Sequence, residues 1–134
     1  MIVVHVEAGT HLYGGAVQVL QLLRGLRKVG AAGDRHVLVC PSGSAIAAAA
    51  QEAADKVYAI PMRGDADIRM RGRVRRVLRA EHADLVHVHS RRGADIWAGL
   101  AAKRERVPAI LSRRVDNPEK RWLVKFKYGL YRRV

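Results

Sequence analysis

The chain has 134 residues, of which 49% are hydrophobic and only 5% aromatic, so we expect one domain whose core is built from Val, Leu, Ile and Ala. Cys40 is the single cysteine, which excludes an intrachain disulfide and favours a reducing compartment. No run reaches the roughly 20 apolar residues that span a bilayer, and no signal peptide is evident. These features predict a cytoplasmic protein.

The formal charge of +13 is concentrated in the second half of the chain. Residues 1–60 contain five Lys/Arg and four Asp/Glu, whereas residues 61–134 contain twenty and eight. Such asymmetry indicates a polyanionic partner: nucleic acid, an acidic membrane surface or a phosphorylated ligand. A solvated basic surface without a partner would give the same count, so this alternative stays open.

Short apolar runs alternate with helical patterns along the chain. The runs predict strands at residues 2–6, 36–40, 57–60, 85–89 and 108–112. Between the strands, helical periodicity or alanine-rich composition predicts helices at residues 16–29, 45–54, 69–79 and 95–104. Asn117 followed by Pro118 predicts the start of a last helix that runs towards Val134.

This alternation implies βαβ units and predicts an α/β, Rossmann-like, doubly wound parallel sheet with helices on both faces. Right-handed crossovers leave few topologies, and we assume the common strand order 3-2-1-4-5. In that order the chain reverses direction between the first and fourth strands. Ligands of such sheets bind beyond the carboxyl ends of the strands at this switch point.

A glycine pair, Gly14 and Gly15, follows the first strand and directly precedes the first helix. Glycines let backbone N–H groups approach an anion, and the helix N-terminus adds partial positive charge, so the pair suits a phosphate. A tight strand-to-helix turn that requires positive φ is the less favoured explanation of the pair. The segment is neither G-x-G-x-x-G nor a Walker A loop, which disfavours nicotinamide dinucleotides and P-loop chemistry.

Histidines mark the first and fourth strands. Strand alternation places His87 and His89 on one face, and His89 falls at the strand end beside the crevice, where it is a candidate ligand or catalytic contact. His5 and His87 lie mid-strand, where we expect hydrogen-bonded core residues that pack close together if their strands are neighbours. A zinc site is not expected, because the histidines lie on different elements and no Cys or carboxylate completes a recognisable spacing.

Arginines follow the last two strands. Arg113 and Arg114 suit phosphate or carboxylate recognition at a strand's carboxyl end, although pairing of Arg114 with a nearby acid is an equally good explanation. Arg91 and Arg92 follow the fourth strand and extend the same basic rim.

The last predicted helix mixes basic and aromatic side chains and suits either an anionic bilayer surface or packing on another part of the protein. The membrane-surface candidates are Lys120, Arg121, Trp122, Lys125, Phe126 and Lys127.

Taken together, these stretches resemble the N-terminal domain of family 4 glycosyltransferases, which have the two-domain GT-B fold. The matching stretches are residues 3–7 with 13–16, 36–41, 84–90 and 107–112, in the family order. The resemblance covers essentially the whole chain, so we expect residues 1–134 to be one such domain. The glycine loop is weakly specific, and the Asp-x-x-His-x-His segment is moderately specific.

The resemblance implies a hexosyltransferase-like enzyme that moves a sugar from a nucleotide-sugar donor, with retention, to a cell-envelope or lipid-linked acceptor. It implies that Gly14 and Gly15 approach the donor diphosphate and that His89 contacts the donor sugar. No metal or cofactor is implied. The domain would mainly hold the acceptor and lie peripherally at the cytoplasmic membrane face. Its acceptor-side candidates are Glu7, Tyr13, Arg91 and Arg92.

Two departures from the family qualify this interpretation. Many members carry a histidine just after the fifth strand, where this chain has Arg113 and Arg114. The family also continues with a second Rossmann-like domain that supplies most nucleotide contacts and a paired-glutamate motif. We therefore expect this chain to be an incomplete, truncated portion that is inactive alone.

Two rival functions remain. One is a non-catalytic basic module that binds an anionic membrane through the arginine-rich third helix and the last helix, with nucleic acid the less favoured partner. The other is a different Rossmann-like enzyme with a phosphorylated ligand, although the sequence offers no nucleophile–base pair for it.

Overall fold

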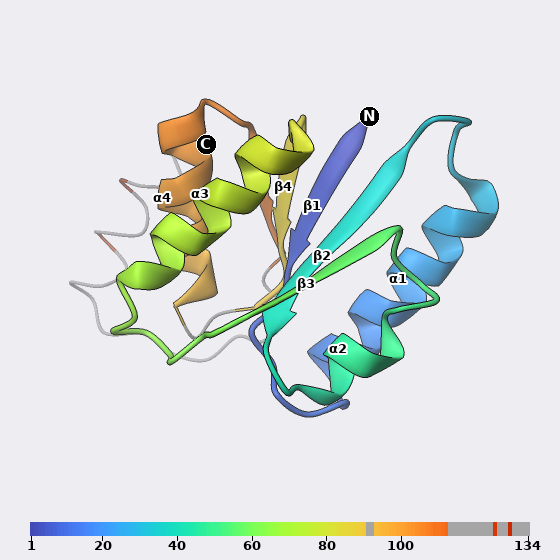
Figure 1. Cartoon of the computed structure of the whole chain (residues 1–134), viewed down its shortest axis with the longest axis horizontal. Coiled ribbons are helices and arrows are strands. Elements are labelled where there is room, and N and C mark those ends of the chain that lie inside the picture. Colours follow the sequence, from blue (N-terminus) through green and yellow to red (C-terminus); the bar gives the residue numbers. More distant parts are fainter. Residues whose placement is uncertain (91–92, 113–124, 126–128, 130–134) are drawn as a thin grey trace.

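The computed structural model describes residues 1–90, 93–112, 125 and 129 as an α/β unit (Figure 1). Its strands are β1 (Ile2–Val6), β2 (Arg35–Pro41), β3 (Lys56–Ile60), β4 (Leu85–Val88) and β5 (Ala109–Leu111). Its helices are α1 (Gly15–Val29), α2 (Ala45–Ala49), α3 (Arg69–Glu81) and α4 (Ala94–Glu105).

The strands form one parallel sheet in the order β3-β2-β1-β4-β5, which confirms the assumed order. Helices α1 and α2 lie on one side of this sheet and α3 and α4 on the other, as Figure 1 shows. The doubly wound prediction is therefore correct. The switch point lies between β1 and β4, which pair directly with His5 opposite His87.

Each face of the sheet has its own apolar core, as expected for parallel strands buried on both sides. On the α3/α4 side, valines of β1, β2 and β4 pack against Met70, Val74 and Leu78 of α3. On the α1/α2 side, Leu38 and Cys40 pack with residues of α1 and α2. The α1/α2 cluster consists of Ala16, Val19, Leu20, Leu23, Leu38, Cys40, Ile46, Ala50, Ala53 and Ala54.

The element ends differ slightly from the predicted ones. The second helix ends at Ala49 instead of residue 54, because the chain continues in single turns such as Ala53 N–H to Ala50 O at 3.0 Å. Strand β4 ends at Val88, but the His89 N–H still donates to Val6 O at 2.9 Å. His89 therefore extends the ladder by one bond.

Most of the predicted last helix lies outside the described residues. Lys125 and Gly129 are described, and both are helical and exposed. Within the described parts of the chain, no helix is both long and apolar enough to cross a membrane.

Candidate functional site

The carboxyl ends of β1 and β4 are joined by hydrogen bonds at the switch point. Beyond the ladder, the Ala8 N–H donates to Ser90 Oγ at 2.6 Å. The Glu7 N–H donates to Val39 O at 3.0 Å, which ties the end of β1 to β2 as well. The loop after β1 and the start of the β4–α4 loop are thus held together, as the topology predicts. Glu7, the glycine loop and His89 share this edge.

The glycine loop makes a sharp entry into α1. Gly14 is the N-cap residue with φ of 52°, a left-handed value that favours glycine, and no side chain caps the helix there. A Cβ at Gly14 would meet no atom within 4 Å, so backbone conformation is the reason for glycine at this position. The tight-turn interpretation is therefore confirmed, and phosphate binding by this loop stays a prediction.

Glu7 supports the glycine loop from beneath. Its side chain is 3% exposed, and Oε1 accepts the Gly9 N–H at 2.7 Å. A Cβ at Gly9 would lie 2.9 Å from that oxygen, so the loop approaches Glu7 closely because residue 9 is glycine. The sequence did not indicate this supporting role. Tyr13, the second acceptor-side candidate, is 67% exposed and stacks with His11 at a ring separation of 5.7 Å.

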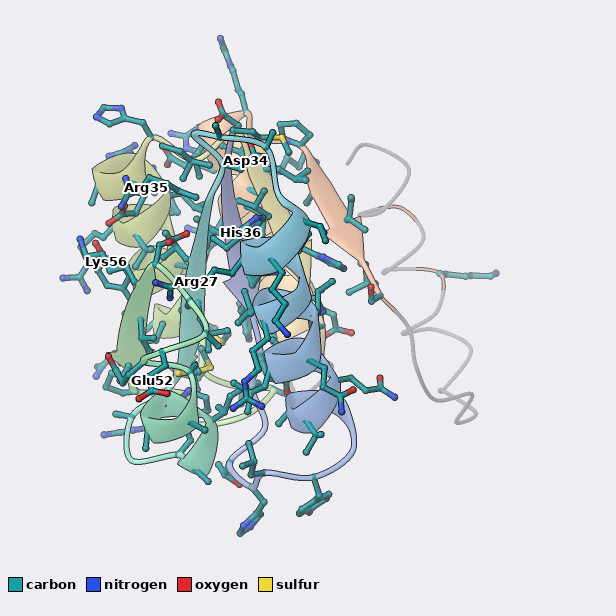
Figure 2. The ribbon with its side chains drawn as sticks, turned by 90° about the vertical axis from the view of Figure 1, so that its right-hand side faces the viewer. Arg27, Asp34, Arg35, His36, Glu52 and Lys56 are labelled. Carbon is teal, nitrogen blue, oxygen red and sulfur yellow. The ribbon has the colours of Figure 1, made fainter. Side chains whose placement is uncertain are left out.

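Behind the edge, four histidines from three adjacent strands gather on the α1/α2 side of the sheet. His5 Nδ1 lies 2.9 Å from His89 Nε2, and His5 Nε2 lies 3.2 Å from His36 Nδ1. The rings of His87 and His89 are 3.8 Å apart, and His87 Nε2 lies 2.7 Å from Ser112 Oγ. Figure 2 labels His36 on the sheet beside α1. We call His5, His36, His87 and His89 the histidine cluster.

His5, at the centre of the histidine cluster, is buried and neutral. Burial lowers the pKa of His5 to about 3, and the nearby His87 and His36 act in the same direction. A neutral imidazole has one donor and one acceptor, so the His36–His5–His89 chain has two possible directions. Either His36 donates to His5 and His5 to His89, or the reverse. The expectation of a packed, hydrogen-bonded core residue is confirmed for His5, whereas His87 packs against His5 and contacts Ser112 Oγ but is only half-buried.

Sequence reasoning missed His36 and did not consider that histidines on neighbouring strands could share a metal ion. Separate elements do not keep the histidines apart, because β1 and β4 are neighbours in register. One nitrogen from each of His5, His87 and His89 lies within 4.8 Å of the other two. Three ligand atoms are thus gathered without any recognisable spacing along the chain. Alternation on β2 could have placed His36 on a face, but not beside His5.

Several predicted site residues lie outside the described residues. These are Arg91, Arg92, Arg113, Arg114, Lys120, Arg121, Trp122, Phe126 and Lys127. Their predicted roles at the edge that holds Glu7 and His89, or at a membrane surface, therefore stay predictions.

The arginine-rich helix α3 is partly neutralised by carboxylates. Arg73 pairs with Asp67 at 2.8 Å, and Arg75 and Arg79 both reach Glu105 at 2.6 Å. On the same side of the molecule, Glu81 binds Arg35 and Lys56, which Figure 2 labels. Arg69, Arg71 and Arg76 remain exposed. Much of the basic charge of this face thus serves local ion pairs.

Solved structures share the fold at low sequence identity. A glycosyltransferase from Rickettsia africae matches with a TM-score of 0.70 and 15% identity over 93% of this chain and 32% of its own. A UDP-GlcNAc 2-epimerase from Neisseria meningitidis, solved with UDP-GlcNAc, matches with a TM-score of 0.63 and 15% identity over 99% of this chain and 37% of its own. The chain spans about a third of the length of both proteins.

The same fold occurs outside sugar chemistry. A hydrogenase domain from Pyrococcus furiosus matches with a TM-score of 0.61 and 17% identity over 84% of this chain and 90% of its own. A comparison with curated proteins finds no match. These structural similarities therefore establish the fold alone, and the family assignment must rest on sequence comparison.

The sequence profile of Glycosyltransferase Family 4 matches residues 13–134, which include the glycine pair, the His-x-His strand and the Val-Pro strand. This match and the fold confirm the resemblance to the N-terminal domain of GT-B glycosyltransferases. The chain belongs to Glycosyltransferase Family 4.

Proposed function

We propose that this chain supplies the acceptor-side domain of an enzyme that transfers a hexose from a nucleotide-sugar donor with retention of configuration. The observation that carries the proposal is the meeting of the glycine loop and His89 at one sheet edge. The bonds from Ala8 to Ser90 and from His89 to Val6 hold this edge together. Family membership and the UDP-GlcNAc bound to the similar Neisseria epimerase support a nucleotide-sugar partner.

In this proposal the diphosphate of the donor lies against the N-terminus of α1. Gly14 and Gly15 give the phosphates close access to the backbone, and the helix dipole stabilises the negative charge that develops on the leaving diphosphate. Arg113 and Arg114 add positive charge. This arrangement supplies electrostatic stabilisation from the protein itself, so we propose that transfer needs no metal at the diphosphate.

His89 contacts the donor sugar in this proposal, and His5 is a positioning residue behind it. The 2.9 Å contact between His5 Nδ1 and His89 Nε2 fixes the orientation of the His89 ring. Glu7 keeps the glycine loop in place from below through Gly9. Tyr13 offers an exposed aromatic face to a glycan or lipid-linked acceptor, together with Arg91 and Arg92.

The test uses the complete gene product that contains this chain, assayed with a panel of nucleotide sugars. Replacing His89 with Ala should lower kcat by about 100-fold, the order expected for one lost transition-state contact. His82→Asn is the matched control, because His82 is an exposed histidine at the C-cap of α3 and Asn tolerates its left-handed backbone. Far-UV circular dichroism checks that both variants fold.

Three outcomes would contradict parts of the proposal. Unchanged turnover in His89→Ala removes the assignment of His89. A product of inverted anomeric configuration, read by NMR, removes retention. Loss of activity in chelator that Mg²⁺ or Mn²⁺ restores and Zn²⁺ does not would refute the proposal that the diphosphate needs no metal.

We also propose a cytoplasmic, peripheral position at an anionic membrane, carried by the basic second half of the chain. Binding to phosphatidylserine vesicles should weaken as salt rises. The ion pairs of α3 leave fewer unpaired arginines than the composition suggests. We therefore assign any such contact to the basic and aromatic residues 120–127. A Lys120→Glu, Arg121→Glu double variant that binds vesicles as well as wild type would refute this assignment.

A further inference from the structure

Three members of the histidine cluster have the arrangement of a metal-ligand set. His5, His87 and His89 each offer one ring nitrogen, and the three nitrogens lie within 4.8 Å of one another. Two of the residues are almost fully buried, at 1% exposed for His5 and 3% for His89. Their backbones are held by neighbouring parallel strands, with His5 directly opposite His87. The set is therefore built on two paired strands in the interior of the sheet.

We propose that His5, His87 and His89 form a binding site for a transition-metal dication of the zinc type. Imidazole nitrogen is a favoured ligand of Zn²⁺, Ni²⁺, Co²⁺ and Cu²⁺, whereas Mg²⁺ and Ca²⁺ prefer oxygen. Three protein ligands also match known zinc sites in which water or substrate takes the fourth position. The site is separate from the diphosphate, for which the glycine loop is the proposed partner.

The distances require only small side-chain movements. In a tetrahedral site with metal–nitrogen bonds of 2.0–2.1 Å, the ligand nitrogens lie about 3.3 Å apart. His5 Nδ1 and His89 Nε2 are now 2.9 Å apart and share a hydrogen bond, so they must separate slightly. The widest pair, at no more than 4.8 Å, must approach by roughly 1.5 Å. We propose that rotation of the half-buried His87 ring closes this gap, which changes the 2.7 Å contact of its Nε2 with Ser112 Oγ.

His36 completes the site as an outer partner. A metal at His5 Nδ1 requires the proton of His5 to be on Nε2, which then donates to His36 Nδ1 across 3.2 Å. His36 carries its own proton on Nε2 in this state. Among the described residues this buried Nε2 atom of His36 has no hydrogen-bond partner, whichever way the His36–His5–His89 hydrogen bonds run. In both directions a proton lies between His5 Nδ1 and His89 Nε2, so a metal held by these two atoms also requires His89 to carry its proton on Nδ1 instead, with both rings still neutral.

Burial supports the same reading. With His5 1% and His89 3% exposed, little water reaches their ring nitrogens to compete with a metal. His36 acts only through His5 and is a positioning residue.

The experiment is titration of the chelator-treated protein with ZnCl₂ by calorimetry and with CoCl₂ by visible absorption. We expect one ion per chain, a tetrahedral Co²⁺ spectrum and a higher Tm with Zn²⁺. His87→Gln and His89→Gln should abolish the Co²⁺ spectrum, and His36→Asn should weaken Zn²⁺ binding about 10–100-fold. His11→Gln and Cys40→Ala are controls that should bind as wild type does.

Absorption spectroscopy at the zinc edge keeps the test decisive if a variant fails to fold. It counts the nitrogen ligands in the wild-type protein, and three imidazoles are expected. No stoichiometric binding, binding that survives both His87→Gln and His89→Gln in folded protein, or a first shell without three imidazoles would each overturn the proposal.

Discussion

Acidification should destabilise this protein well above the pH at which carboxylates become protonated, because His5 is buried and neutral. The pKa of His5 falls from 6.5 to about 3, with burial as the main cause. The unfolded chain therefore binds a proton that the folded chain does not. The stability that His5 contributes is fully present above about pH 6.5 and is lost as the pH falls towards 3.

The size of the effect follows from the two pKa values. Between them, stability falls by about 1.4 kcal/mol per pH unit. From pH 7 to pH 5 the expected loss is about 2 kcal/mol, because the unfolded-state histidine is only partly protonated in the first half unit. Hydrogen bonds and salt bridges lower the pKa of the Asp67, Glu81 and Glu105 carboxyls, so these groups lose their contribution at lower pH and do not mask this window.

Urea unfolding in chelator at half-unit steps from pH 7 to pH 5 measures the effect. The other members of the histidine cluster, His36, His87 and His89, face His5, so NMR of the imidazole protons is needed to assign the titration. His5→Gln should flatten the pH dependence, and the exposed His11→Gln should leave it unchanged. An NMR titration of His5 near pH 6.5, or a wild-type loss below about 1 kcal/mol from pH 7 to pH 5, would refute the reasoning.

Three further predictions test the fold. Gly93→Ala should lower the free energy of unfolding by at least about 1–2 kcal/mol, because Gly93 has φ of 82° and a Cβ there would lie 2.9 Å from Gly64 O. Gly25 lies in open space on α1, so Gly25→Ala should instead raise the free energy of unfolding by about 0.5–1 kcal/mol. Equal effects of the two substitutions in urea unfolding would refute this contrast. Glu81→Ala should lower the free energy of unfolding by about 1–2 kcal/mol, since it removes the acceptor shared by Lys56 and Tyr58. A melting temperature equal to that of wild type would contradict this prediction. Burial raises the pKa of the Cys40 thiol to about 11, so maleimide at pH 8 should label it only after denaturation, and rapid labelling of folded protein would show otherwise.

The order of elements and the location of the site were predictable from local patterns. Apolar runs followed by Pro41 and Pro61 marked strands, and helical periodicity between them implied right-handed crossovers. Because carboxyl ends of parallel strands meet at one edge, Gly14 and His89 were expected to lie on the same side of the molecule, and they do. The exact ends of α2 and β4 were not predictable, since they depend on single hydrogen bonds.

The histidine cluster shows where sequence reasoning ends. Side-chain alternation correctly placed His87 and His89 on one face, but it gave no reason to connect either of them with His36. The argument against a metal site considered separate elements and spacing along the chain, whereas contacts between strands bring nitrogens of His5, His87 and His89 within 4.8 Å of one another; metal binding there stays a proposal.

The sequence by itself determined that the strands are parallel and buried on both faces, that the family is Glycosyltransferase Family 4, and that the charge lies in the second half. Only the tertiary structure decided that His36, His5 and His89 form one hydrogen-bonded chain and that Glu7 supports the glycine loop. The physical reason is that a strand's period sets the face of a side chain. Strand order and register, which come from packing of the whole sheet, set its neighbours.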